Sequence, residues 1–276
     1  MIKIIALSIS LILGTLTSTT FTFNHPSLYV LVAIGFTIVY LVVIVSIFFL
    51  SAIIMDIPIN TKKKPEKYNR RYQRIFTFYV NCALSTFGVD LKGKGIEKLP
   101  KDTNFIIVGN HVSNLDPLVT NKYLKKTPFI FASKESLFKV PFFGKMIHKI
   151  GYLRLNRNDV RKDVKELERG YKWVKDGDCS LAIYPEGTRN KNDDVVLLPF
   201  KETCFKFAKN LQKPIVVSVI NGTKETNNHL LTKKHIVQYE IIDCLYYDDY
   251  KDMSASELSD YVYKMMEKRI LELRSE

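Results

Sequence analysis

The sequence lacks the signatures of several large classes of site. Its four cysteines lie far apart, with no CxxC pair and no Cys/His cluster. Neither a disulfide framework nor a metal site is therefore expected, and reduced thiols on the cytosolic side fit best. The HExxH, Walker-type and GxGxxG motifs are missing, and no serine lies in a G-x-S-x-G elbow. The sequence calls for no metal, no redox cofactor and no serine nucleophile.

Charge is nearly absent from the first 55 residues, where Lys3 is the only charged side chain. We expect residues 1–60 to form a membrane anchor of two hydrophobic helices, at about 4–23 and 28–55. Roughly 20 apolar residues span a bilayer core, so the second stretch is long enough and the first is borderline. The short linker between them contains a proline and suits a helical hairpin. A cleaved signal peptide is the alternative for the first stretch, but its Thr-rich end lacks a small-residue cleavage pattern.

The remaining charge is strongly basic, with 41 Lys and Arg against 28 Asp and Glu and a net charge of +13. Such a surplus indicates an anionic partner: nucleic acid, a membrane surface or a phosphorylated substrate. No helix-turn-helix, zinc-finger or RNP-type motif accompanies the charge, so we expect no nucleic acid and favour membrane lipids. A cluster of Lys and Arg follows the second apolar stretch, whereas the linker between the two stretches has neither residue. The cluster consists of Lys62–Lys64, Arg70, Arg71 and Arg74. The positive-inside rule then places everything after residue 60 in the cytoplasm.

Residues 61–90 alternate basic and apolar side chains at helical spacing. Ile75, Phe78, Tyr79, Ala83 and Phe87 could form one apolar face. The pattern predicts a basic amphipathic helix that lies against the inner leaflet. An ordinary helix that packs on the following domain explains the same spacing about equally well, and both interpretations stay open.

From residue 91 to 276, short β-rich runs alternate with longer amphipathic ones. The expected strands lie at 105–109, 129–132, 152–155, 180–184, 215–220 and about 236–245. The expected helices lie near 117–126, 159–176, 201–211 and 254–274. Such alternation is typical of an α/β fold with a largely parallel central sheet flanked by helices.

His111 and Asp116 form a candidate catalytic pair. His111 directly follows an expected strand, and Asp116 precedes Pro117, a combination typical of the N-cap and first position of a helix. Residues five apart on a straight helix point about 140° away from each other, so the two can meet only if 111–115 is a loop. Asp116 would then fix the tautomer of His111 and leave its other nitrogen as a general base. In a chain with five histidines, one H-x4-D pattern arises by chance about a third of the time, so the pair alone proves little.

Three cations stand at the ends of three other expected strands. Lys134 follows 129–132, Arg157 follows 152–155, and Arg189 closes the segment YPEGTR that begins at residue 184. Carboxyl ends of parallel strands meet at one edge of a sheet, where these side chains could bind one phosphate. Gly187 would allow a close backbone approach to the anion. For any single cation, chance placement in so basic a chain is the simpler explanation.

Together these segments resemble a known family. In chain order the sequence carries NHVSNLD, KESLFKVPFFG, GYLRLNR, YPEGTR, PFK and KPIVVSV between residues 110 and 219. The series is similar to the glycerolipid acyltransferases of the 1-acyl-sn-glycerol-3-phosphate acyltransferase type, over about residues 86–220. Tyr184 stands where that family usually has Phe, Thr203 where it often has Gly, and Ser218-Val219 replaces a Pro-Val pair.

The resemblance implies an O-acyltransferase in residues 91–276 that acts in phospholipid biosynthesis. His111 would deprotonate the acceptor hydroxyl, Asp116 would orient it, and attack on the acyl thioester would be direct. Asn114 would line the pocket. Three cations would hold the acceptor phosphate: Lys134, Arg157 and Arg189.

The resemblance also implies that Glu186, Gly187 and Thr188 shape the pocket wall, although Glu186 could equally order the arginines by a salt bridge. The expected reaction transfers a fatty acyl group from acyl-CoA or acyl carrier protein to 1-acyl-sn-glycerol 3-phosphate, a lysophospholipid, and gives phosphatidic acid. Other acceptors stay open: glycerol 3-phosphate, a lysophosphoethanolamine or a lyso-aminolipid. A non-catalytic membrane adaptor is the alternative from another class. We expect the protein at the cell membrane, with its catalytic domain on the cytoplasmic face.

Overall fold

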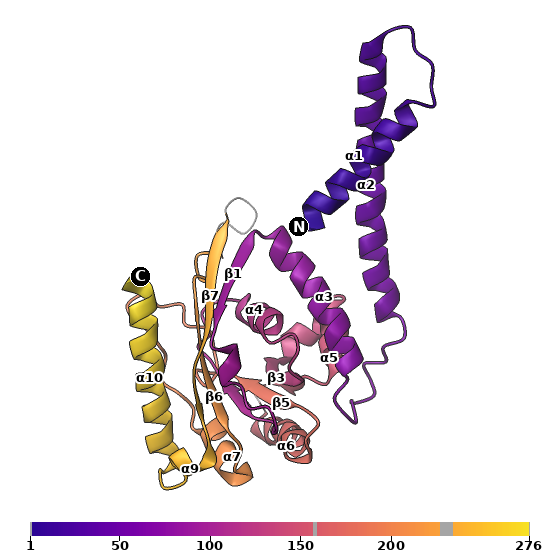
Figure 1. The fold of residues 1–276 in the computed structure, drawn as a ribbon. Coiled ribbons are helices and arrows are strands. Elements are labelled where there is room, and N and C mark those ends of the chain that lie inside the picture. The colour runs from indigo at the N-terminus through magenta and orange to yellow at the C-terminus, as the bar shows by residue number, and fades with distance from the viewer. Residues whose placement is uncertain (1, 157–158, 227–233, 276) are drawn as a thin grey trace. The chain divides into compact units, whose positions relative to one another are not determined.

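The computed structural model describes residues 2–156, 159–226 and 234–275 and separates into two compact units, 1–60 and 61–276 (Figure 1). The first unit consists of α1 (Ile2–Ser18) and α2 (Pro26–Asp56). The two helices approach closely at Gly14, where an added Cβ would lie 2.3 Å from Oγ1 of Thr37. A hydrogen bond of 2.8 Å joins Thr17 Oγ1 and Tyr40 Oη across the pair. Small residues and hydroxyls of this kind are typical of helix contacts in membranes.

Within the described residues, α2 is the one helix that is long and apolar enough to cross a membrane, while α1 is apolar but shorter. Apolar side chains of both helices are widely exposed, which indicates that the protein associates with a membrane. α1 ends at Ser18, earlier than the expected residue 23. The hydroxyls of Thr19 and Thr20 donate to the carbonyl oxygens of Leu16 and Thr17, and such local bonds compete with continuation of the helix.

The second unit is built on a seven-stranded sheet in the order β1-β7-β6-β2-β5-β3-β4. The strands are β1 (Val89–Lys94), β2 (Ile106–Val108), β3 (Phe129–Lys134), β4 (Leu153–Leu155), β5 (Ser180–Ile183), β6 (Ile215–Asn221) and β7 (His235–Leu245). All neighbouring pairs are parallel except β6 with β7. The expectation of a largely parallel sheet flanked by helices is therefore confirmed, with one reversal that places β1 and β7 antiparallel to the other five strands.

Helices cover both faces of this sheet (Figure 1). One face carries α3 (Arg70–Thr86), α4 (Asp116–Tyr123) and α5 (Phe143–Ile150), together with the short helix η2 (Glu135–Lys139). The other face carries α6 (Val160–Asp176), α7 (Thr203–Leu211) and α10 (Ala255–Ser275). Two short elements complete the unit, η1 (Ile96–Lys98) and α9 (Tyr247–Tyr250). The central strands β2, β5 and β6 are buried almost throughout, so their Ile, Leu and Val side chains form the middle of the core.

The helix expected within 61–90 is present as α3, and the face by which it packs on the domain is not the apolar face that was expected against the inner leaflet. Phe76, Val80 and Leu84 are buried, whereas Phe78 is 55% exposed. Two polar residues also lie on the buried face, Gln73 and Thr77. Their hydrogen bonds to Thr127 O and to the Oδ1 atom of Asn121 satisfy them there. A hydrophobic pattern cannot foresee such buried polar pairs, so the face by which α3 packs on the domain could not be predicted from the sequence.

Candidate active site

The carboxyl ends of five parallel strands, β6, β2, β5, β3 and β4, lie at one edge of the sheet. His111 follows β2, the segment Tyr184–Arg189 follows β5, and Lys134 ends β3. Neighbouring strands are about 4.8 Å apart, so the ends of β2 and β3 are separated by roughly 10 Å. The fold thus brings the candidate residues to a common edge. Arg157, which was expected to join them after β4, lies outside the described residues.

His111 and Asp116 are in contact. The Nδ1 atom of His111 lies 2.8 Å from Oδ2 of Asp116. The side chain of Asp116 is fully buried and that of His111 is 17% exposed. An ionised carboxylate only accepts hydrogen bonds, so Nδ1 carries the proton and Nε2 is left as the basic nitrogen. This is the arrangement that a general base requires.

Asp116 also organises the loop between the two residues. Its Oδ2 atom accepts from the backbone N–H groups of Val112 and Ser113, at 2.7 and 2.8 Å. The expected loop over 111–115 is present, but the expected N-cap is wrong: Leu115 is the N-cap, and Asp116 is the first residue of α4. The carboxylate points back into the preceding loop, where its Oδ2 atom is engaged by the loop and by His111.

The ring of Tyr184 lies flat against the imidazole of His111, with ring centroids 4.4 Å apart and an angle of 10° between the planes. Burial raises the pKa of the Tyr184 hydroxyl well above its usual range, so the ring stays neutral. Stacking and the bond to Asp116 together fix the imidazole from two directions. The sequence had indicated Tyr184 only as a departure from a family pattern, because no residue spacing predicts a ring stack between two strand ends.

Glu186 is buried and supports the backbone of the site. Its Oε1 atom accepts from the N–H of His111 at 2.7 Å, and its Oε2 atom accepts from the N–H of Leu198 at 2.9 Å. No ion pair joins Glu186 to an arginine among the described residues, and Arg157 lies outside them. Burial raises the pKa of Glu186 to about 7, against the opposing effect of the two backbone hydrogen bonds.

Gly187 lies in the left-handed region at φ 68°, and a Cβ placed on it would lie 2.9 Å from the Cε and Nζ atoms of Lys201. Lys201 therefore lies against the turn and is a further cation of this edge, which sequence analysis had included only as part of the PFK block. Thr188 is exposed and Arg189 half-exposed. Among the described residues, Arg189 has neither a hydrogen bond nor an ion pair, so its guanidinium is available to a ligand.

Lys134 and Asn114 are both exposed. Lys134 also lacks a protein partner in the part of the chain that the structure describes. Asn114 stands in the loop between His111 and Asp116, so it borders these two residues without a hydrogen bond to either. Exposed side chains of this kind are where substrate contacts can form.

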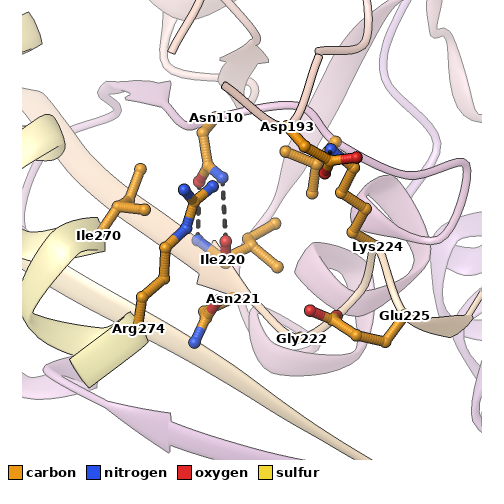
Figure 2. A pocket seen from close by; sticks show the side chains of 10 residues that line it. Asn110, Asp193, Ile220, Asn221, Gly222, Lys224, Glu225, Ile270 and Arg274 are labelled. Atoms are coloured by element: carbon orange, nitrogen blue, oxygen red, sulfur yellow. Dashed lines mark hydrogen bonds and ion pairs between the residues drawn. The ribbon is translucent and has the colours of Figure 1, made fainter. Parts of the chain in front are cut away.

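A cavity of about 170 Å³ lies beside the segment that follows β2 (Figure 2). It is lined by Asn110 and Val112 from the segment after β2, Asn221 at the end of β6, Gly222 and Lys224 after it, and Arg274 from α10. Lys224 is paired with Asp193 at its rim. The amide of Asn110 is fully engaged, since it donates to the carbonyl of Ile220 and accepts from its N–H, at 2.9 and 2.8 Å.

Comparison with known proteins decides the family. The acyltransferase family model matches residues 90–221, which include His111, Asp116 and the segment 184–189. A 1-acyl-sn-glycerol-3-phosphate acyltransferase of Haemophilus influenzae is 31% identical over 183 residues, which cover 65% of this chain and 75% of that protein. The chain belongs to the 1-acyl-sn-glycerol-3-phosphate acyltransferase family. The expected resemblance and the expected O-acyltransferase class are thereby confirmed.

Further members of the family agree. The enzyme of that name from Borreliella burgdorferi is 29% identical over 196 residues, 68% of this chain and 76% of that protein. The crystal structure of the 1-acyl-sn-glycerophosphate acyltransferase PlsC from Thermotoga maritima has a TM-score of 0.61 and 25% identity, and it covers 75% of this chain and 82% of that one. The α/β fold with its mainly parallel sheet is thus shared within the family.

Proposed function

We propose that this protein transfers a fatty acyl group from a thioester donor to the free hydroxyl of 1-acyl-sn-glycerol 3-phosphate and so forms phosphatidic acid. The observation that carries the proposal is the contact between His111 and buried Asp116, both of which lie within the range matched by the family model. The names of the relatives give the acceptor. The donor, acyl-CoA or acyl carrier protein, is inferred from the chemistry of the site.

In this mechanism Nε2 of His111 takes the proton of the acceptor hydroxyl as the oxygen attacks the thioester carbonyl. A new ester bond forms, the C–S bond breaks, and the proton passes to the leaving thiolate. Asp116 stabilises the imidazolium that exists between these steps. Attack is direct, so no protein nucleophile is needed. Burial raises the pKa of the Cys204 thiol to about 12, which keeps this cysteine unreactive.

The acceptor phosphate is held, in our proposal, by Lys134, Arg157 and Arg189, with Asn114 and Thr188 at the border of the pocket. Support comes from the sheet order, because β2, β5 and β3 are consecutive and their ends carry His111, Arg189 and Lys134. Support also comes from the unpaired state of Lys134 and Arg189 in the described chain. Phosphate binding would hold the hydroxyl beside His111, and positioning of this kind lowers reaction barriers by several kcal/mol.

The protein would work at the cytoplasmic face of the cell membrane, with 1–60 as its anchor. The exposed side of α3 carries Arg71, Arg74 and Phe78, a combination of cations and an aromatic ring that suits an anionic lipid interface. We place this side of α3 against the inner leaflet. Both the acceptor and the acyl chain could then enter the site from the bilayer.

The function is tested by acyl transfer in purified membranes with a panel of donors and acceptors. Each donor is tested as acyl-CoA and as acyl carrier protein, and each acceptor with and without a phosphate. Wild type should form phosphatidic acid, and His111→Gln should be slower by about 10²-fold to 10⁴-fold because the general base is lost. His148→Gln is the matched control, since His148 is buried on α5 and bonds to the carbonyl of Lys63. The proposal fails if wild type transfers acyl groups to no acceptor, or if His111→Gln keeps full activity.

The phosphate site has its own test in Arg189→Ala. This variant should lose activity on phosphate-bearing acceptors and keep it on acceptors without phosphate. Equal losses on both would remove Arg189 from the phosphate site and leave the rest of the proposal intact.

A further inference from the structure

We propose that Thr223 is a positioning residue of the acyl-transfer site, which holds Asp116 in the orientation that His111 requires. Thr223 lies just after β6 and is separated from Asp116 by 107 residues of chain, yet its hydroxyl donates to Oδ1 of Asp116 at 2.6 Å. It also lies beyond the family-matched region, which ends at residue 221. The inference rests on the proposed function, because it assigns Thr223 to the same reaction.

The two oxygens of Asp116 are used differently. Oδ2 accepts from three donors: the ring of His111 and the backbone N–H groups of Val112 and Ser113. Among the described residues, Oδ1 has one donor, the hydroxyl of Thr223. Asp116 is 0% exposed, and a buried carboxylate oxygen without a donor is costly. Thr223 is therefore what satisfies Oδ1.

The position of Thr223 is itself fixed. Its side chain is fully buried, and the hydroxyl of Thr226 donates to its carbonyl oxygen at 2.6 Å. Gly222 turns the chain at φ 85°, where an added Cβ would lie 2.3 Å from the carbonyl oxygen of Ile236. Two residues before Gly222, Ile220 is bound through both its backbone groups by the side chain of Asn110 (Figure 2). The end of β6 is thus attached to the residue that precedes His111.

These contacts set the rotation of the Asp116 carboxylate about its Cβ–Cγ bond. With Thr223 on Oδ1, the other oxygen faces Nδ1 of His111 and selects the tautomer with the proton on Nδ1. Without the hydroxyl, Oδ1 is buried and unsatisfied, and the carboxylate gains by rotating toward another donor. The tautomer with a basic Nε2 then loses part of its support, so the catalytic step slows while acceptor binding does not change.

The test compares Thr223→Val, which keeps the shape but removes the hydroxyl, with Thr223→Ser, which keeps the hydroxyl. In the full-length protein in membranes, Thr223→Val should lower kcat by about 10-fold to 100-fold, the effect expected for a lost hydrogen bond to a charged group, and change KM less than about twofold. Thr223→Ser should restore kcat. Thr77→Val is the matched control, because Thr77 is also buried and donates to Asn121 Oδ1 at 2.6 Å. It should keep the wild-type kcat.

A second readout does not depend on activity. The ¹⁵N chemical shifts of His111, assigned by comparison with His111→Gln, report which ring nitrogen carries the proton. Wild type and Thr223→Ser should show the Nδ1–H form, whereas Thr223→Val should show an increased share of the Nε2–H form. If Thr223→Val does not fold, Thr223→Cys replaces it in both measurements, since a thiol is only a weak donor.

The proposal is overturned if Thr223→Val keeps both the wild-type kcat and the wild-type tautomer of His111. The same holds for Thr223→Cys where that variant replaces Thr223→Val. A loss of kcat that Thr223→Ser does not restore also overturns it, because the hydroxyl would then not be the cause. A wild type without acyl-transfer activity would instead contradict the proposed function, and the ¹⁵N measurement would still decide the contact between Thr223 and Asp116.

Discussion

Glu186 shows, at the scale of a single residue, how a buried acid can support the backbone of a site. Its carboxylate joins the backbone of His111 after β2 to that of Leu198 in the segment before α7. Burial raises its pKa from 4.5 to about 7. A raised pKa means that the folded state holds the proton more tightly, so the contribution of this group to stability is full below about pH 4.5 and is lost as pH rises through about 7.

We therefore predict a pH-dependent effect of Glu186→Gln. The amide cannot titrate, and it offers one acceptor oxygen in place of two, so one backbone N–H loses its bond. The melting temperature of wild type should exceed that of the variant most at pH 5, and the difference should shrink toward pH 8. Thermal unfolding in detergent across that range measures it. A difference that grows with pH would contradict the assigned pKa direction.

Tyr184 is a residue whose ring and hydroxyl can be tested separately. The ring stacks on His111 at 4.4 Å, while the hydroxyl lies 3.4 Å from Oγ1 of Thr120, a weak contact. Tyr184→Phe should keep kcat within about threefold of wild type, because the stack persists. Tyr184→Leu should lower kcat by about tenfold or more, since a stacked pair contributes about 0.5–1.5 kcal/mol and also holds the imidazole plane. Equal kcat values for the two variants would show that the stack does not matter.

At the scale of an element, α3 has two sides with different tasks. Phe76 is 2% exposed and packs edge-on against Phe143 of α5 at 5.4 Å, whereas Phe78 is 55% exposed. Phe76→Ala should cost about 3–5 kcal/mol of unfolding free energy through the cavity that it leaves. Phe78→Ala should cost little stability, and in our proposal it weakens contact with anionic lipid.

Denaturation in detergent measures the stability of each variant, and depth-dependent quenching by brominated lipids in proteoliposomes measures the contact of a Phe78→Trp ring. Leu271→Trp on α10, also exposed, is the matched control for quenching. Equal quenching at both positions would contradict the proposed orientation of α3.

The elements that were predicted well are those whose residues carry a strong local signal. Ile215–Asn221 is a buried apolar run, and α6 shows apolar steps of three and four residues and ends at Gly177 in the left-handed conformation. β1 was not predicted, because its sequence VDLKGK is polar and rich in glycine and lysine, and it becomes a strand by pairing with β7 from the far end of the chain. α5 was not predicted either. It has only eight residues and begins after Phe142, whose φ of 60° is rare for a residue other than glycine.

In the candidate site, too, some contacts could be predicted from local sequence and others could not. His111 and Asp116 lie within one loop, so their spacing could indicate the contact, and the family blocks could indicate the edge of the sheet. The contacts of Tyr184, Glu186 and Thr223 join segments that lie 73 to 107 residues apart in the chain. Some of them involve backbone groups, as in the hydrogen bond from the His111 N–H to Glu186, which spans 75 residues. No spacing in one sequence encodes such contacts, because the sheet order that creates them is a property of the whole fold.

At the scale of the whole molecule, the distribution of charge predicts the orientation of the protein in the membrane. The net charge is +13, yet the first 55 residues carry one charge, and Lys62–Lys64, Arg70, Arg71 and Arg74 follow closely after α2. The α1–α2 connection has no Lys or Arg. Cations near the end of a span favour the cytoplasm, so residues 61–276 should lie on that side.

Fusions at the C-terminus test this orientation. A green fluorescent protein placed after residue 276 should fluoresce, and an alkaline phosphatase at the same point should be inactive, because each reporter works on one side only. Four lysines inserted between residues 24 and 27 should reduce the fluorescence, since they oppose the asymmetry on which the orientation depends. Four glutamines inserted there are the matched control and should leave it unchanged. An active phosphatase fusion in the unmodified chain would place the catalytic unit outside the cytoplasm and away from the acyl donors that the proposed reaction consumes.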